Sequence, residues 1–144
     1  MPKVLIVDDH AIVRSGLRRF LDEEAKGYDV REAANGPQGL ELCRAERWDV
    51  VLLDLSLPGI GGQAVLQQLR QNYPDLPVLM LSFALEAEQI RECLDAGAAG
   101  YVVKEEIPDH ILPAIRAVLA GNRYLSPEVK VVIAPNPGNP PFAG

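Results

Sequence analysis

Short apolar runs alternate with longer amphipathic segments along most of this chain. The apolar runs are too short for helices and are rich in branched side chains, which favours buried strands of a parallel sheet. Between the runs, apolar residues recur every three or four positions, as they do in helices that cover one face of a sheet. The expected strands are 3–7, 29–34, 49–53, 77–81 and 100–103.

The segments between these strands carry signals that start or stop helices. Helices are expected at 11–24, 37–46 and 86–95, with a third lined by Val65, Leu66 and Leu69 and a fifth lined by Ile111, Ile115 and Val118. Pro37 suits the first turn of a helix, and Gly97 and Gly121 suit helix ends. Five strands alternating with five helices predict an α/β fold, doubly wound, with right-handed crossovers.

Composition narrows the class of protein. The chain has 144 residues, a net charge of −6 and 48% hydrophobic residues, which is enough for one domain with its own core. An acidic chain is a poor non-specific binder of nucleic acid. No apolar run approaches the roughly 20 residues of a membrane span, and no signal peptide is visible. Two cysteines are too few for a disulfide framework, so we expect a cytoplasmic protein.

The end of the chain differs from the rest. The last ten residues hold four of the 12 prolines and no charged residue. Such a segment buries too little apolar surface to offset the entropy of ordering it. We therefore expect the folded unit to span about 1–125, and 126–144 to contain the start of a linker and a Pro-rich, disordered tail that covers 134–144.

Polar residues directly follow four of the expected strands. Asp8 and Asp9 follow the first strand, Asp54 the third, Ser82 the fourth and Lys104 the fifth. Doubly wound sheets bind ligands beyond the carboxyl ends of their strands, so we expect these side chains to share one crevice. Three carboxylates would repel each other there unless a cation lay among them, and hard oxygen ligands with room for water suit Mg²⁺.

This combination of groups favours phosphoryl transfer. A divalent metal and a lysine neutralise phosphoryl oxygens while an aspartate accepts the group. Asp54 is the expected acceptor, because it stands alone on the middle strand with the other residues around it. Taken singly, an aspartate at a strand end is more often a helix cap, and a loop histidine such as His10 is more often solvated. The argument therefore depends on four strand ends that match together.

These residues resemble the receiver domain of bacterial two-component response regulators. The matching segments are VDDH with Asp8 and Asp9, LLDLSLPGIGG with Asp54, LMLS with Ser82, and AAGYVVK with Tyr101 and Lys104. The resemblance covers about residues 1–125. It implies the flavodoxin-like (βα)5 fold, with a five-stranded parallel sheet of order 2-1-3-4-5.

The resemblance also implies how the acidic residues act. Asp54 would receive a phosphoryl group from a sensor histidine kinase or a phosphotransfer protein. Asp9, Asp54 and the backbone carbonyl of Ser56 would ligate Mg²⁺ directly, and Asp8 would act largely through water. No enzyme activity is implied beyond phosphorylation and dephosphorylation of the protein itself.

The remaining matched residues would read the phosphoryl group. Lys104 would bind a phosphoryl oxygen, and Ser82 would donate a hydrogen bond to the group and move towards it. Tyr101 would turn inward as Ser82 moves, which makes a two-state switch. The sequence departs from the family at Phe83, because the position after the switch hydroxyl is commonly small. A phenyl ring there is expected to narrow access to Asp54 and to slow phosphoryl transfer or hydrolysis.

The segment that follows the fifth helix points to a subgroup. Residues 114–129, AIRAVLAGNRYLSPEV, resemble the junction of NarL/FixJ-type regulators, where a linker leads to a LuxR-type helix-turn-helix domain. The 17 residues after Pro127 are too few for such a DNA reader. We expect a receiver from a longer transcription regulator, which binds DNA only through a domain outside this chain. A stand-alone single-domain regulator is the alternative, and a homodimer is possible in either case.

Two other classes of function compete with this interpretation. A phosphatase of the haloacid dehalogenase class also uses an aspartate nucleophile, but it needs a second aspartate two residues later, where this chain has Ser56. A phosphorylation-independent interaction module would keep the fold and lose the switch. Phe83 is the only feature that supports this second alternative.

Overall fold

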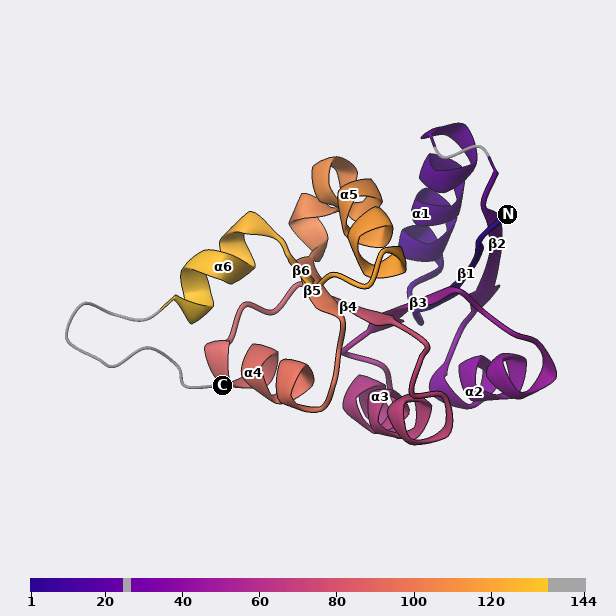
Figure 1. Cartoon of the computed structure of the whole chain (residues 1–144), viewed down its shortest axis with the longest axis horizontal. Helices are drawn as coiled ribbons and strands as arrows, with labels where there is room; N and C mark the ends of the chain where they lie inside the picture. The colour runs from indigo at the N-terminus through magenta and orange to yellow at the C-terminus, as the bar shows by residue number, and fades with distance from the viewer. Residues whose placement is uncertain (25–26, 135–144) are drawn as a thin grey trace.

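The computed structural model describes residues 1–24 and 27–134, and these form a parallel sheet covered by helices on both faces (Figure 1). The strands are β1 (Lys3–Val7), β2 (Asp29–Ala33), β3 (Val50–Asp54), β4 (Val78–Ser82), β5 (Gly100–Val103) and β6 (Tyr124–Leu125). The helices are α1 (Ala11–Glu24), α2 (Gly36–Ala45), α3 (Gly61–Asn72), α4 (Ala87–Asp95), α5 (Ile107–Leu119) and α6 (Pro127–Ile133). A 3-10 turn, η1 (Lys104–Glu106), precedes α5.

The sheet has the order β2-β1-β3-β4-β5-β6, and every neighbouring pair is parallel. Its first five strands follow the predicted order 2-1-3-4-5. The expectation of a five-stranded sheet is corrected by β6, whose two residues are too few to give a periodic signal. Gly100 makes room for this strand, because a Cβ atom there would lie 2.2 Å from the carbonyl oxygen of Tyr124.

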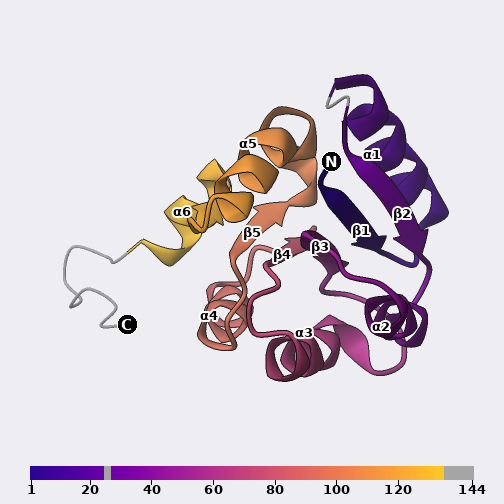
Figure 2. The ribbon, with the colours of Figure 1, turned by 45° about the vertical axis from the view of Figure 1, so that its right-hand side comes forward.

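Alternate residues of the strands face two apolar layers. One layer lies between the sheet and helices α1 and α5, and the other lies between the sheet and helices α2, α3 and α4 (Figures 1 and 2). Every residue of β3, β4 and β5 is buried. Burial on both faces explains why these strands read as unbroken apolar runs in the sequence.

Helix α6 lies beyond residue 125, where the sequence suggested that the folded unit ends. Val129 of this helix is fully buried in the same apolar layer as α4. Just before the helix, the buried Ser126 Oγ accepts a hydrogen bond of 3.2 Å from the Val103 N–H at the end of β5. The packed body therefore extends at least through α6. The expected tail lies outside the described residues except for Ala134, and the division into receiver and linker stays a prediction.

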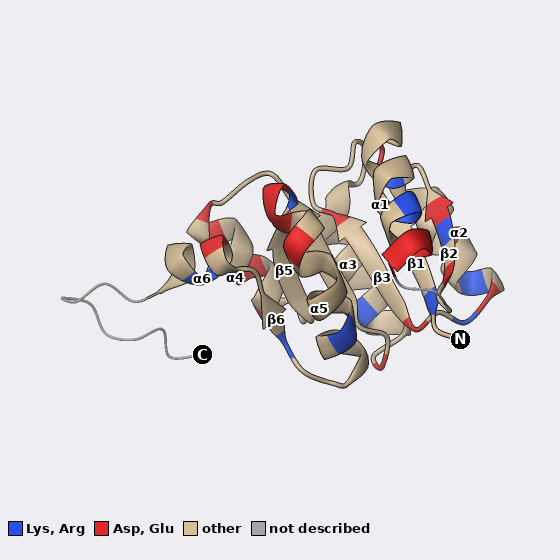
Figure 3. Ribbon diagram, turned by 90° about the horizontal axis from the view of Figure 1, so that it is seen from above, with Lys and Arg blue, Asp and Glu red and all other residues tan. Residues whose placement is uncertain are grey.

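Charges of both signs are interspersed over α1, β2 and α2 (Figure 3). Arg14 and Arg18 of α1 both pair with Glu32 of β2, and Arg31 of β2 pairs with Glu46 just after α2. Such a mixed surface differs from the basic face that a DNA reader presents. Among the described helices, none has the length and apolar character that crossing a bilayer requires.

Both cysteine thiols are expected to be unreactive at neutral pH. Cys43 and Cys93 are buried and free, and burial raises the pKa of each from 9.0 to about 11. At pH 8 the thiolate fraction is then roughly a hundredfold below that of an exposed thiol. A disulfide reagent should therefore react slowly with native protein and rapidly with two thiols in urea. Because the folded-state pKa values are raised, stability should also fall as the pH rises from about 9 through 11.

Candidate functional site

The carboxyl ends of β1, β3 and β5 bring three ionisable side chains into one buried pocket. Asp54 is the last residue of β3, Asp8 directly follows β1, and Lys104 directly follows β5. Their exposed fractions are 1%, 0% and 6%. The Lys104 Nζ lies 2.8 Å from Asp8 Oδ2 and 3.3 Å from Asp54 Oδ1. Residues that are far apart in the sequence thus meet as the strand-end argument predicts.

The two carboxylate oxygens of Asp54 have different surroundings. Oδ1 accepts a hydrogen bond of 3.0 Å from the Ser56 N–H, whereas Oδ2 is buried without a hydrogen-bond partner among the described residues. Burial raises the pKa of Asp54, and the negative charge of Asp8 adds to this; the Ser56 N–H and the Lys104 ammonium oppose it. An unpaired buried acceptor costs about 1–3 kcal/mol, so this oxygen is suited to receive a ligand.

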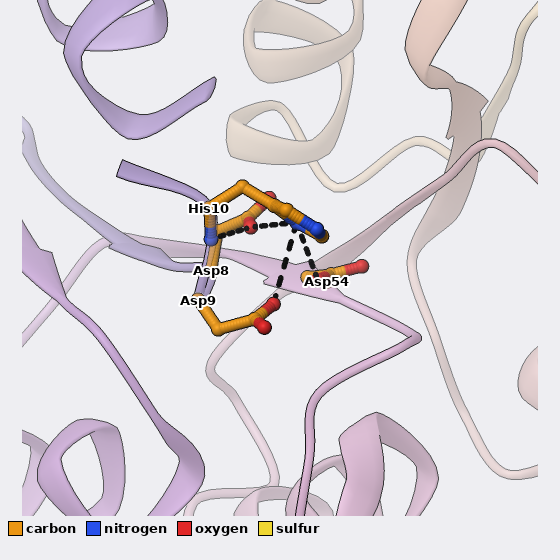
Figure 4. Close-up of side chains that lie close together, drawn as sticks. All are labelled: Asp8, Asp9, His10 and Asp54. Carbon is orange, nitrogen blue, oxygen red and sulfur yellow. Dashed lines mark hydrogen bonds and ion pairs between the residues drawn. The ribbon is translucent and has the colours of Figure 1, made fainter. Parts of the chain in front are cut away.

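Asp9 and His10 complete the pocket on its exposed side (Figure 4). The His10 Nδ1 lies 3.1 Å from Asp8 Oδ1, 3.3 Å from Asp9 Oδ1 and 4.0 Å from Asp54 Oδ2. The expectation of a solvated loop histidine holds, because the side chain is 55% exposed, and the structure in addition places its ring nitrogen among the carboxylates. The His10 N–H also donates to Asp8 Oδ1 at 2.8 Å, which ties this residue to the pocket.

The donor set of the pocket fits a divalent cation. Asp8, Asp9, His10 and Asp54 each offer a ligand atom, and these four atoms lie within 4.8 Å of one another. Carboxylates are hard oxygen ligands, and the unpaired Asp54 Oδ2 is one of the oxygens that a cation would satisfy. Ser56 is exposed in the turn after β3, and the role of its carbonyl oxygen stays a prediction.

Ser82 and Tyr101 are joined through one residue of the loop between β4 and α4. The Ser82 Oγ accepts a hydrogen bond of 3.0 Å from the Ala84 N–H, and the Tyr101 hydroxyl donates one of 3.0 Å to the Ala84 carbonyl oxygen. Tyr101 is fully buried, so its ring already lies inside the protein. Ala84 therefore connects the two residues that the sequence suggests as a switch.

Phe83 stands at the rim of the pocket. Its residue surface is 57% exposed, and its ring centroid lies 5.2 Å from the Lys104 Nζ. A cation at this distance from an aromatic face is attracted by the ring quadrupole. The ring thus has both solvent contact and an interaction with the lysine of the pocket.

Gly62 is a site-supporting residue that the sequence marks only as part of a loop. A Cβ atom on Gly62 would lie 2.3 Å from the carbonyl oxygen of Asp54 and 2.6 Å from the Leu55 Cα. The glycine therefore lets α3 begin directly against the end of β3. The only feature of the sequence that points to this contact is the pair Gly61 and Gly62 in the loop that follows Asp54.

Gly62→Ala is expected to lower the free energy of unfolding by about 1–3 kcal/mol, because the new methyl group overlaps backbone atoms that cannot move aside easily. Urea unfolding followed by circular dichroism measures this loss. Gly16→Ala in α1 is the matched control: a Cβ atom there meets no atom within 4 Å, so we expect it to stabilise the helix slightly. Equal stability of the Gly62→Ala variant and the wild type would contradict the packing argument.

Comparison with known proteins decides the family. The model of the family described as "Response regulator receiver domain" matches residues 4–116. The chain belongs to this family. The family consists of signalling proteins.

The similar sequences are longer transcription and response regulators. The chain is 41% identical over 137 residues to the transcriptional activator protein ExaE of Pseudomonas putida. The aligned region covers 94% of this chain and 64% of ExaE. It is 38% identical over 149 residues to the response regulator UvrY of Escherichia coli K12. That alignment covers 99% of this chain and 68% of UvrY. This receiver-sized chain thus spans about two thirds of the length of these relatives.

Solved structures give the same family and subgroup. A LuxR-family two-component response regulator from Aurantimonas sp. SI85-9A1 superposes with a TM-score of 0.85 at 38% identity, covering 91% of this chain and 94% of that one. A CheY-like receiver domain protein from Methanospirillum hungatei JF-1 superposes with a TM-score of 0.78 at 28% identity, covering 84% and 95%. The resemblance to LuxR-type receivers inferred from the sequence is therefore confirmed.

Proposed function

We propose that Asp54 is the phospho-accepting residue of this receiver. The observation that carries the proposal is the buried Oδ2 of Asp54, which has no hydrogen-bond partner in the part of the chain that the structure describes and lies at the end of the central strand between Lys104 and the acidic pair Asp8 and Asp9. A carboxylate with one free oxygen, beside a cationic side chain, is suited to act as a nucleophile towards phosphorus.

The proposed reaction is a phosphoryl transfer from a phosphohistidine of a kinase or phosphotransfer protein. An oxygen of Asp54 forms a bond to phosphorus, the P–N bond of the donor breaks, and the released imidazole takes up a proton. Lys104 turns from Asp8 towards the new phosphoryl oxygens and neutralises part of their charge. Positioning and charge neutralisation supply most of the rate acceleration in such transfers.

The metal that we propose for the pocket is Mg²⁺, held by Asp9, Asp54 and the carbonyl of Ser56, with Asp8 acting through water. When bound, it supplies positive charge that offsets the negative charge of the acids and of the phosphoryl group. Asp9 suits direct ligation because its side chain is 31% exposed and can approach an ion from the open side. Asp8 suits an indirect role because both of its oxygens already have partners, the His10 N–H and Lys104.

The proposed switch runs from Ser82 to Tyr101 through Ala84. The Ser82 hydroxyl accepts from the Ala84 N–H with a lone pair, and its proton would be donated to a phosphoryl oxygen once the group is present. Movement of Ser82 towards that oxygen pulls on Ala84, and the Tyr101 hydroxyl holds the carbonyl of the same residue. The loop that leads to α4 would therefore change position with phosphorylation, which is a two-state response to a local charge.

We further propose that the output is DNA binding through a domain outside this chain. ExaE, which is 41% identical, is named a transcriptional activator, and the chain spans only part of its length. RcsB, which shares the fold at 23% identity, has been solved as dimers bound to DNA, and a homodimer is our proposal here as well. The partner that phosphorylates the receiver would be a sensor histidine kinase. Two free buried cysteines agree with a reducing, cytoplasmic location.

The test is the intact mass of the protein after incubation with acetyl phosphate and Mg²⁺. The wild type should gain the mass of one phosphoryl group, and Asp54→Asn should gain none. Asp49→Asn is the control. Asp49 directly precedes the first residue of β3, at the end of the strand away from the pocket, and accepts a hydrogen bond from the Lys3 N–H. No gain in the wild type, or an equal gain in Asp54→Asn, would overturn the proposal. Turnover of a generic phosphate ester would favour a phosphatase instead.

A further inference from the structure

We infer that His10 is a nitrogen ligand of the metal pocket, and that it gives the pocket a preference for divalent transition metals such as Ni²⁺ and Co²⁺ over Mg²⁺. The inference rests on the proposed metal pocket and adds to it a ligand that the acidic residues do not supply. It concerns which ion binds, and the phosphorylation of Asp54 is a separate matter.

The spacing of the His10 ring nitrogen from the acidic oxygens fits a shared ion. Two ligands of an octahedral ion at about 2.1 Å lie about 3.0 Å apart when they are adjacent and about 4.2 Å apart when they are opposite. The His10 Nδ1 lies 3.1 Å from Asp8 Oδ1, 3.3 Å from Asp9 Oδ1 and 4.0 Å from Asp54 Oδ2. The separations from Asp9 Oδ1 and Asp54 Oδ2, the two acids proposed as direct ligands, fall in or next to this range, and Asp8 Oδ1 lies at hydrogen-bond distance from the same nitrogen.

A second observation points to a ligand at the same place. The Asp54 Oδ2, which lies 4.0 Å from the His10 Nδ1, is buried and has no hydrogen-bond partner among the described residues (Figure 4). An ion held by His10 and Asp9 would satisfy this oxygen directly. The four ligand atoms span up to 4.8 Å, so binding requires the set to contract by a fraction of an ångström. The partly exposed side chains of Asp9 and His10 leave room for this movement.

The local backbone holds His10 in a position from which it can ligate. Its N–H donates to Asp8 Oδ1 at 2.8 Å, and its carbonyl accepts from the Arg14 N–H at 3.0 Å in the first turn of α1. Both of these bonds involve the backbone. The ring nitrogen Nδ1 contacts Asp8 Oδ1 at 3.1 Å, and an ion bound to Nδ1 would take the place of this contact. The side chain is 55% exposed, so its replacement should leave the fold intact.

The chemistry of the ligand decides the preference. Mg²⁺ favours oxygen ligands and keeps several waters, so an imidazole adds little to its affinity. Imidazole suits Ni²⁺, Co²⁺ and Zn²⁺, whose affinities for mixed nitrogen and oxygen sites rise along the transition series. A pocket of carboxylates alone would bind both kinds of ion through oxygen. A pocket that also offers the His10 nitrogen binds the transition-metal ions more tightly and leaves the affinity for Mg²⁺ almost unchanged.

The experiment is isothermal titration calorimetry of the untagged protein with NiCl₂ and, separately, with MgCl₂. His10→Ala is expected to weaken Ni²⁺ binding by at least about tenfold and to change Mg²⁺ binding by less than about threefold. His110→Ala is the matched control, because His110 is the other histidine of the chain. It lies in α5, where its ring forms a hydrogen bond with the Tyr124 hydroxyl. The visible spectrum of bound Co²⁺ should shift in His10→Ala and stay unchanged in His110→Ala.

The outcomes separate the two proposals. If the wild type binds Mg²⁺ and His10→Ala leaves the Ni²⁺ affinity and the Co²⁺ spectrum unchanged, the inference about His10 is wrong and the acidic pocket stands. An equal loss of affinity for both ions in His10→Ala would also overturn it. If neither ion binds the wild type, or if Asp54→Asn binds both as tightly as the wild type, the metal pocket itself is wrong.

Discussion

Lys104→Met is expected to lower the free energy of unfolding by about 3–5 kcal/mol in the absence of divalent metal. Lys104 is the cation that faces both Asp8 and Asp54, and all three side chains are almost completely buried. Methionine keeps the apolar stem but leaves two buried carboxylates side by side. The charge of each then raises the cost of ionising the other. Urea unfolding at pH 7.5 with EDTA measures the loss.

The matched control for Lys104→Met is Arg44→Met. Arg44 pairs with Glu41 on the surface of α2, where the two side chains are 64% and 68% exposed. Pairs this exposed contribute little to stability, so this variant should unfold close to the wild type. Adding Asp8→Asn to Lys104→Met should restore part of the lost stability. The double variant no longer contains the Asp8 carboxylate, which the single variant leaves buried without its lysine partner. A loss below about 1 kcal/mol for Lys104→Met would show that the buried pair does not stabilise the fold.

Phe83→Ala is expected to accelerate the phosphorylation of Asp54 by acetyl phosphate on the order of tenfold, which corresponds to about 1.4 kcal/mol in the barrier. Two features of the ring explain this. It stands at the rim of the pocket with 57% of the residue surface exposed, and we expect it to narrow the approach to the carboxylate. It also attracts the Lys104 ammonium, whose Nζ lies 5.2 Å from the ring centroid, and so opposes the turn of that side chain towards a phosphoryl oxygen.

The rate is measured from the increase of phosphorylated mass with time at a fixed acetyl phosphate concentration. The same variant should lose its phosphoryl group faster after the donor is removed, because water also gains access to Asp54. Val131→Ala on α6 is the control: it also removes an exposed hydrophobic side chain, at 76% exposure, but on a helix away from the pocket. A rate equal to or below that of the wild type would mean that Phe83 neither blocks the pocket nor restrains Lys104.

The paths of β1, β3, β4 and β5 were predictable because these strands are buried on both faces. Burial on both sides forces continuous apolar runs, and the first polar residue after each run then marks the edge of the sheet. For this reason the sequence alone predicts that Asp8, Asp54 and Lys104 lie close together. The strand ends differ only slightly from prediction, since β3 and β4 include Asp54 and Ser82 as their last residues.

Short or solvent-exposed features gave no such signal. The two residues of β6 have no measurable period, and their pairing depends on the absence of a side chain at Gly100. The packing of α6 was also missed, because one buried valine, Val129, in a Pro-flanked segment does not distinguish a docked helix from a linker. Both features are decided by contacts between residues far apart in the chain.

The sequence by itself determined the fold class and the meeting of Asp8, Asp54 and Lys104, which follow from periodicity and from residue types at strand ends. The order of the first five strands came from the resemblance to receiver domains, which the motifs of short segments carry. Only the tertiary structure decided which oxygen of Asp54 has no hydrogen-bond partner among residues 1–24 and 27–134, that Ala84 joins Ser82 to Tyr101, and that the His10 ring lies among the carboxylates. The physical reason is that hydrogen-bond partners and burial of single atoms depend on distances of a few ångströms between separate elements, which no local pattern encodes.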